Sequence, residues 1–194
     1  QQSPIPSGLE ADLILKKVCI YGAGAIGGWV GVKLARAGCD VGVVARGTTL
    51  EALQTHGLRL EQGGQTLSAP VRASASPAGL GVQDLVIVAV KAPSMGEVAK
   101  AIAPLMGPHT IVLTAMNGVP WWFFEGFGGP LEGTRLKAVD PDGSIAQAVP
   151  GRHIVGCVVH ASCALEGPGL GAALSPDLLA RSDARVRLSG ARSV

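Results

Sequence analysis

Short apolar runs alternate with segments of helical period along the first two thirds of the chain. Residues 18–21, 41–45, 84–90, 110–116 and 153–161 form runs that predict buried strands. The run at 84–90 is apolar throughout its middle, which is typical of a central parallel strand covered by helices on both faces. Because helical segments separate the strands, the order predicts an α/β fold with a doubly wound, mostly parallel sheet.

The helical segments have recognisable ends. Apolar positions recur at helical spacing from Ile26 to Ala37, and Gly38 follows them as a C-cap. We expect a second helix at 48–56, with Thr48 or Thr49 as its N-cap, and a third at 94–106.

Glycine and proline mark the connections. Gln62-Gly63-Gly64 is a turn signal that predicts a hairpin between 58–60 and 67–73. An aromatic-rich helix or loop is expected from Pro120, and residues 167–171 have the composition of a loop.

Composition narrows the class of protein. The chain has 194 residues, which is room for little more than one domain, and 47% of them are hydrophobic, which excludes a disordered chain. A net charge of +2 is too small to predict binding to nucleic acid or to a membrane surface. No apolar run reaches the roughly 18 residues of a membrane span. We therefore expect a cytoplasmic protein that binds neither nucleic acid nor membrane, with its four cysteines reduced.

Gly22-Ala23-Gly24-Ala25-Ile26-Gly27 matches G-x-G-x-x-G between a predicted strand and a predicted helix, where dinucleotide-binding domains of the Rossmann type carry it. Gly22 permits a tight turn, Gly24 lets a pyrophosphate approach the backbone, and Gly27 lets the helix pack on the strand. The phosphates would then meet the helix N-terminus. The alternative is a glycine-rich turn that only connects two elements.

Arg46 stands after the second predicted strand, where NAD-binding domains usually place a carboxylate for the ribose. A guanidinium can bind a 2′-phosphate bidentately, so this position favours NADP over NAD. Thr48 and Thr49 could add hydroxyl donors. The alternative is a solvated surface arginine.

Lys91 and Asn117 follow two successive predicted strands. The carboxyl ends of parallel strands share one edge of the sheet, where ligands of open α/β sheets bind. Each residue alone would pass for a loop residue facing water, but together they predict a shared crevice. The lysine offers a point charge to phosphate or carboxylate, and the asparagine offers an amide donor and acceptor.

These motifs together resemble the ketopantoate reductase (2-dehydropantoate 2-reductase) family, NADPH-dependent enzymes of pantothenate biosynthesis. The resemblance covers about residues 17–170 and rests on four segments in register: Tyr21–Gly27, Ala45-Arg46-Gly47, Val88–Ala92 and Asn117-Gly118-Val119.

The resemblance implies roles for particular residues. The glycine loop from Gly22 to Gly27 would hold the pyrophosphate of NADP, and Arg46 its 2′-phosphate. Lys91 and Asn117 would line the nicotinamide and keto-acid crevice, and Ser162 would flank the cofactor at the edge of the sixth strand.

The same resemblance implies a second, helical domain that supplies the catalytic lysine as general acid, together with substrate-binding residues. We expect residues 1–16 to be a leader, 17–170 an NADP-binding Rossmann domain and 171–194 an irregular tail, with the chain truncated before the helical domain. This leaves no catalytic residue of its own in the chain, and we expect it to bind NADPH with little turnover.

Three functions stay open. The first is NADPH-dependent reduction of a 2-keto acid, 2-dehydropantoate, to pantoate. The second is a non-catalytic NADP-binding remnant or redox sensor. The third is another two-domain dehydrogenase with this N-terminal layout, of the glycerol-3-phosphate or 6-phosphogluconate type.

Two further clusters have simpler interpretations. Trp121, Trp122, Phe123, Phe124 and Phe127 could close over a substrate, but packing against a second domain or self-association is favoured. Cys157, His160 and Cys163 have the spacing of metal ligands. Strand alternation would point His160 away from both cysteines, so no metal is expected.

Overall fold

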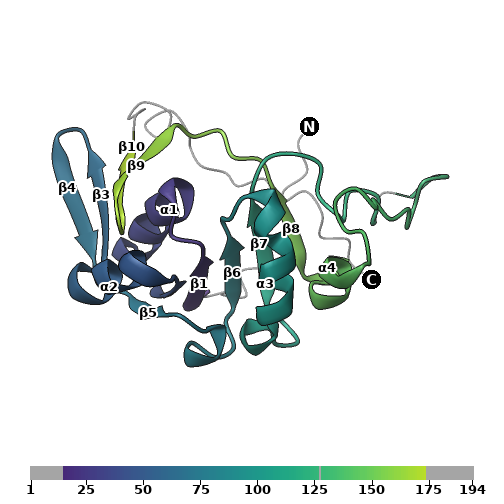
Figure 1. The fold of residues 1–194 in the computed structure, drawn as a ribbon, viewed down its shortest axis with the longest axis horizontal. Coiled ribbons are helices and arrows are strands. Elements are labelled where there is room, and N and C mark those ends of the chain that lie inside the picture. The colour runs from purple at the N-terminus through teal and green to yellow at the C-terminus, as the bar shows by residue number, and fades with distance from the viewer. Residues whose placement is uncertain (1–14, 127, 174–194) are drawn as a thin grey trace, which may run out of the picture.

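The computed structural model describes residues 15–126 and 128–173. Its main sheet has six strands in the order β5-β2-β1-β6-β7-β8, and all neighbours are parallel (Figure 1). The strands are β1 (Lys17–Tyr21), β2 (Asp40–Val44), β5 (Arg72–Ser74), β6 (Leu85–Val88), β7 (Ile111–Ala115) and β8 (Ile154–Cys157). The order runs outward in opposite directions from β1 and β6, which makes their boundary the switch point of a doubly wound sheet.

Helices cover both faces of this sheet, as its apolar strands predict. They are α1 (Ala25–Arg36), α2 (Gly47–His56), α3 (Met95–Ala101) and α4 (Ser144–Ala148), with short 3-10 turns at Pro77–Gly79, Ala92–Ser94, Ala103–Leu105 and Gly151–His153. Alternate residues of β1 enter opposite cores. Val18 and Ile20 pack with α1 and α2, while Cys19 and Tyr21 pack with α3 and α4. The predicted α/β fold is confirmed.

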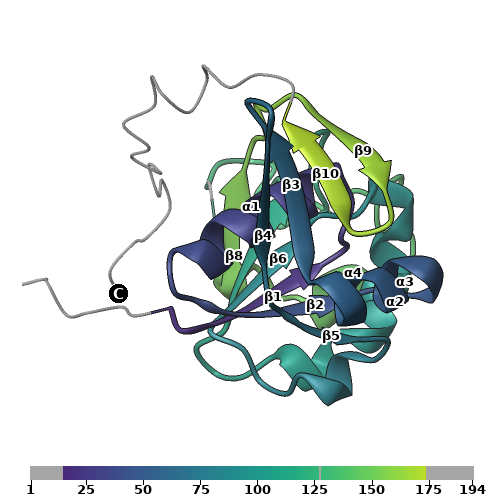
Figure 2. The same cartoon turned by 90° about the vertical axis from the view of Figure 1, so that its left-hand side faces the viewer.

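A second sheet covers the outer side of α1 (Figures 1 and 2). Its strands are β3 (Leu58–Gln62), β4 (Gln65–Ala69), β9 (Cys163–Gly167) and β10 (Leu170–Ala173), in the order β4-β3-β10-β9. β3 and β10 pair in parallel although they lie far apart in the sequence, and all four strands contact α1. Helix α1 is therefore enclosed between two sheets.

Glycines allow α1 to fit this narrow space. Gly31 faces both sheets: a Cβ there would lie 2.6 Å from Leu58 Cδ1 of β3 and 3.2 Å from Ile20 Cγ1 of β1. Both neighbours are almost completely buried, at 1% and 0% exposed, so neither has room to move aside. Gly28 is also buried, yet a Cβ there would meet nothing within 4 Å.

Prolines and glycines explain where the predicted elements were wrong. The segment 67–73 is not one strand: β4 ends at Ala69, before Pro70, and β5 belongs to the main sheet. Helix α3 ends at Ala101 and not at 106, because Pro104 lacks the N–H that a continuing helix needs. The N-cap of α2 is Arg46 and not a threonine, because Gly47, at φ 55°, turns the chain into the helix directly after β2.

The C-terminal part of the described chain also differs from expectation. Residues 167–171 are not a loop but the turn and flanks of the β9–β10 hairpin, in which Gly169 has φ 66°. β10 runs across the expected start of an irregular tail at 171, and residues 174–194 lie outside the described part. Strand β8 stops at Cys157, where its pairing with β7 ends, so 158–161 is not strand.

Helix α4 has no counterpart among the predicted elements. The buried carboxylate of Asp140 accepts hydrogen bonds from the backbone N–H groups of Ile145 and Ala146 at 3.1 and 3.0 Å. These bonds satisfy donors that the first turn of a helix leaves free.

Across the described ranges, no helix has the length and apolar character to span a membrane.

Alanine substitutions at two glycines of α1 should have opposite effects on stability. Gly28→Ala should raise the free energy of unfolding by roughly 0.5–1 kcal/mol, because it removes backbone freedom without a clash. Gly31→Ala should lower it by about 1–3 kcal/mol, because Leu58 and Ile20 must shift. Urea unfolding followed by far-UV circular dichroism measures both. Equal stabilisation by the two variants would mean that α1 does not lie this close to the sheets.

Candidate functional site

The glycine loop joins β1 to α1 at the switch point of the sheet. Gly22 has φ 104°, and a Cβ there would lie 2.8 Å from Val90 Cγ1 in the loop after β6. A Cβ on Gly27 would collide with the carbonyl oxygen of Gly22. Gly24 differs from both because its Cβ position is open, with no atom of residues 15–126 or 128–173 within 4 Å. The loop therefore folds tightly on itself and leaves the space in front of Gly24 free.

The N-terminus of α1 opens into this space. Gly24 is the N-cap, no side chain in the described part of the chain caps the helix, and the first turn contains no acidic residue. The N–H groups of a first turn have no partners within the helix, and the helix dipole adds partial positive charge there. This geometry suits an anion such as a pyrophosphate.

Arg46 lies at the next strand end, between β2 and α2. Its side chain is exposed and makes no hydrogen bond or ion pair within residues 15–126 and 128–173. Burial raises the pKa of the Tyr21 hydroxyl, and the positive charge of Arg46 offsets part of that rise. Arg46 is therefore close to the carboxyl end of β1, on the same edge as the glycine loop. Helix α2 also begins without a side-chain cap.

Lys91 and Asn117 follow β6 and β7, which are adjacent parallel strands. Lys91 is exposed, and its side chain has no partner within the described ranges. The side chain of Asn117, in contrast, is held by two hydrogen bonds. Its Nδ2 donates to the carbonyl oxygen of Val159 at 3.4 Å, and its Oδ1 accepts from the N–H of Val159 at 3.2 Å. The side-chain amide thus connects the end of β7 to the segment after β8.

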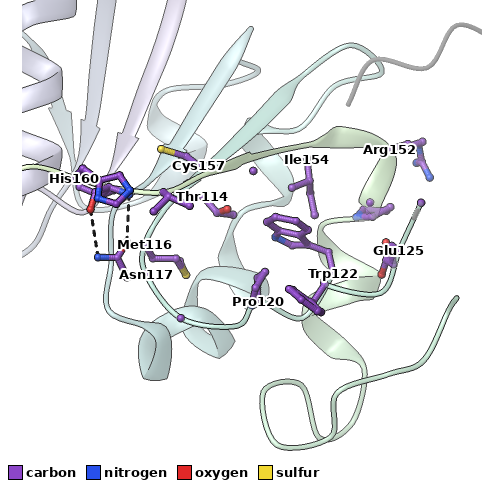
Figure 3. Close-up of a pocket in the computed structure, with 18 residues that line it drawn as sticks. Thr114, Met116, Asn117, Pro120, Trp122, Glu125, Arg152, Ile154, Cys157 and His160 are labelled. Carbon is purple, nitrogen blue, oxygen red and sulfur yellow. Dashed lines mark hydrogen bonds between the residues drawn. The ribbon is translucent and has the colours of Figure 1, made fainter. Parts of the chain in front are cut away.

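A cavity of about 1010 Å³ begins at Asn117 and follows the edge strand β8 (Figure 3). Its lining is largely apolar in the middle and polar at the two ends. Asn117 and His160 lie at one end, and Glu125 and Arg152 at the other. Between them the lining includes Met116, Pro120, Trp122, Ile154 and Gly156.

The residues of the aromatic cluster differ in how far their side chains are exposed to solvent. Trp121 is only 3% exposed and belongs to the core with α3 and α4, so the expectation that it takes part in self-association is wrong. Phe123 is 45% exposed and packs edge to face on Phe124, with ring centroids 5.1 Å apart. Phe127 lies outside the described residues. Association through Trp122, Phe123 and Phe124 stays a prediction.

Cys19 is a buried core thiol, whereas Cys39, Cys157 and Cys163 are partly exposed. Burial raises the pKa of Cys19 to about 12, and it also raises the pKa values of Cys157 and Cys163. Within residues 15–126 and 128–173, no three His, Cys, Asp or Glu side chains lie in a position to hold a metal ion together. The alternation argument for His160 does not apply, because β8 ends at Cys157.

Comparison with known proteins decides the family. The family model described as ketopantoate reductase PanE/ApbA matches residues 18–121, which is more than half of the chain. The chain belongs to the ketopantoate reductase family. A 2-dehydropantoate 2-reductase from Mesorhizobium japonicum is 53% identical over 155 residues, which cover 79% of this chain and 48% of that protein.

Solved structures of the family have the same fold. A protein from Ralstonia solanacearum MolK2, whose crystal structure carries the name ketopantoate reductase, is 59% identical with a TM-score of 0.78. The match covers 82% of this chain and 49% of that one. A PanE/ApbA family ketopantoate reductase from Ralstonia eutropha JMP134 is 28% identical with a TM-score of 0.64, over 82% of this chain and 46% of the other. The chain of residues 1–194 thus spans about half the length of each of these relatives.

Four of the predicted site positions meet at one edge of the sheet. The glycine loop, Arg46, Lys91 and Asn117 follow β1, β2, β6 and β7. Ser162 is exposed and directly precedes β9 in the second sheet. The roles of all these residues toward cofactor and substrate stay predictions. Sequence reasoning missed Val159, whose backbone holds Asn117, and the cavity wall formed by Ile154 and Gly156. No local pattern marks either, because both depend on contacts between distant segments.

Loss of the Asn117 amide should loosen the segment after β8. In Asn117→Ala the N–H of Val159 loses its acceptor, so its amide hydrogen should exchange roughly fivefold faster, as expected for a lost hydrogen bond of ~1 kcal/mol. Hydrogen exchange followed by NMR measures it.

Asn117→Asp is the matched control, because it keeps an acceptor for that N–H and should retain most of the protection. Unchanged exchange in Asn117→Ala would show that the two bonds do not hold the segment.

Proposed function

We propose that this chain is the nucleotide-binding half of an NADPH-dependent reductase of 2-dehydropantoate. The proposal rests chiefly on one arrangement: a helix N-terminus without a side-chain cap behind a glycine loop, with the Arg46 guanidinium at the next strand end, where it has no hydrogen-bond or ion-pair partner among the described residues. A pyrophosphate and a 2′-phosphate are the two anionic groups of NADPH. Family membership and the Mesorhizobium relative's name supply the substrate.

The residues of the loop fit a dinucleotide. The open Cβ position of Gly24 leaves room for a pyrophosphate in front of the N–H groups of α1. Gly22 and Gly27 support this opening from behind, because any side chain on them would meet backbone or the loop after β6. Arg46 would hold the 2′-phosphate through bidentate, charge-assisted hydrogen bonds, with the uncapped N-terminus of α2 beside it.

The chain's own residues bind and orient, and NADPH, when bound, supplies the hydride. Lys91 offers a positive charge to phosphate or to the substrate carboxylate. Asn117 already uses one N–H donor and one oxygen lone pair in its hydrogen bonds with Val159. One amide N–H and one lone pair therefore remain for a ligand. Ser162 would flank the cofactor. The proton for the substrate oxygen comes, in this proposal, from a lysine in the half of the relatives that this chain does not cover.

Charge reversal at Arg46 tests the choice of cofactor. Arg46→Asp should weaken NADPH binding roughly ten- to hundred-fold, the cost of losing a hydrogen-bonded charge, and should make NADH the tighter ligand. The fold should tolerate the change, because Arg46 is exposed and aspartate is a favoured N-cap for α2. Isothermal titration calorimetry with both nucleotides gives the two affinities.

Arg36→Asp is the matched control. It changes the net charge equally but lies at the last turn of α1, at the opposite end from the glycine loop. It should leave the preference for NADPH intact. Equal affinities of the parent chain for NADPH and NADH would contradict the role of Arg46.

Gly24→Val tests the phosphate loop itself. A Cβ at position 24 would meet no described residue within 4 Å, and the backbone of Gly24, at φ −78° and ψ −167°, is one that valine adopts. The far-UV circular dichroism should therefore match that of the parent, while NADPH binding falls below detection, because the side chain fills the pyrophosphate position. Retained binding would mean that the loop is only a connector.

A further inference from the structure

The cavity beside β8 contains two polar groups without partners in its apolar middle. Thr114, in β7, is 2% exposed, and its hydroxyl makes no hydrogen bond with another described residue. The indole N–H of Trp122 is buried and has no partner within residues 15–126 and 128–173. Both residues line the cavity (Figure 3). Because buried polar groups are costly unless they are hydrogen-bonded, these two groups mark a position for a polar ligand atom.

The register of the sheet brings the two groups to the same level of the cavity. Thr114 pairs with Gly156 across β7 and β8, and neighbouring strands lie about 4.8 Å apart. The indole of Trp122 rests on Gly156, where a Cβ would lie 2.7 Å from Cη2 and 3.4 Å from Cζ2. Cζ2 is two bonds away from the indole nitrogen. The N–H edge of the ring therefore lies beside the strand position opposite Thr114.

A ligand hydroxyl can satisfy both groups. The indole nitrogen can only donate a hydrogen bond, whereas the hydroxyl of Thr114 can donate and accept. A hydroxyl on the ligand accepts from the indole and donates to the threonine, while an ammonium group would leave the indole N–H without an acceptor. The surrounding wall of Met116, Pro120 and Ile154 offers apolar contact to the rest of the ligand.

The position of Thr114 suits a short oxo acid. Thr114 precedes Asn117 by three residues, which is at most roughly 10 Å along an extended chain. A hydrogen bond at each end takes about 3 Å of this distance. In 2-dehydropantoate a single carbon atom separates the oxo carbon from the carbon that carries the hydroxyl group. The molecule can therefore place its oxo acid group at Asn117 and its hydroxyl toward Thr114.

We propose that Thr114 and the indole N–H of Trp122 form a subsite for the hydroxyl group of 2-dehydropantoate. The inference rests on the proposed function, because that function places the oxo acid group at Asn117. It adds two specificity-determining residues, which favour the hydroxylated acid over the same acid without its hydroxyl. Gly156 supports the subsite, because any side chain there would push the indole away from β8.

The deoxy analogue 3,3-dimethyl-2-oxobutanoate tests the subsite, because it differs from 2-dehydropantoate only in lacking the hydroxyl. NMR titrations of the full 194-residue chain, with and without NADPH, give the dissociation constants of the two acids. 2-Dehydropantoate should bind about tenfold more tightly than the analogue, as expected when buried polar groups lose their partner.

Variants assign the preference to the two groups. Thr114→Val keeps the shape of the side chain without its hydroxyl, so it should bring the two acids to within about twofold of each other. Thr114→Ser keeps a hydroxyl and should retain most of the preference. Trp122→Phe keeps a ring but removes the N–H, and it should reduce the preference in the same direction as Thr114→Val.

Two controls accompany these variants. Thr66→Val makes the same exchange in β4 of the second sheet and should leave the preference unchanged. In the free chain Thr114→Val should not lower the urea midpoint, because the hydroxyl that it removes has no partner among the described residues. A structural hydroxyl would instead lower the midpoint when it is removed.

The outcomes separate this inference from the proposed function. If the chain binds NADPH but binds neither acid, or does not distinguish them, or still distinguishes them in Thr114→Val, the inference alone is overturned. If the chain distinguishes the two acids through Thr114 but does not bind NADPH, the subsite is supported and the nucleotide role is overturned.

Discussion

The close approach of helix α1 to strand β1 is the contact on which the rest of the structure depends. Gly27 places the helix start against the carbonyl of Gly22, and Gly31 places its middle within reach of Ile20. Larger residues at these positions would push the helix away from the sheet, because the neighbouring atoms are buried and closely packed. The second sheet contacts the other side of α1 through all four of its strands.

The contact between α1 and β1 also positions the groups at the carboxyl edge of the main sheet. With α1 fixed on β1, its uncapped N-terminus faces the switch point, where the loops after β1 and β6 touch through Gly22 and Val90. Parallel pairing of β2, β1, β6 and β7 then brings Arg46, Lys91 and Asn117 to that edge. Asn117 is held by the backbone of Val159, so a residue proposed to orient substrate is itself positioned by the segment after β8.

The other end of the sheet is organised by buried polar and aromatic groups. Asp140 caps α4, and Ile145 of that helix shares a core with Trp121. Trp121 anchors the aromatic segment, while its neighbour Trp122 turns onto Gly156 and becomes a wall of the cavity. Adjacent residues of the same type thus serve different purposes, one in the core and one beside the candidate substrate site.

The sequence by itself determined the main strands of the parallel sheet, helices α1 to α3, the glycine loop and the strand-end positions of Arg46, Lys91 and Asn117, because apolar period and glycine spacing are local signals. It did not predict α4 or the β9–β10 hairpin. It located helix ends less well where Gly47 or Pro104 changed the backbone. Only the tertiary structure decided the pairing of β3 with β10, the burial of Trp121 and the bond between Asn117 and Val159, 42 residues apart. Each of these depends on which distant segments meet, and that is settled by the packing of the whole chain around α1 rather than by any local pattern.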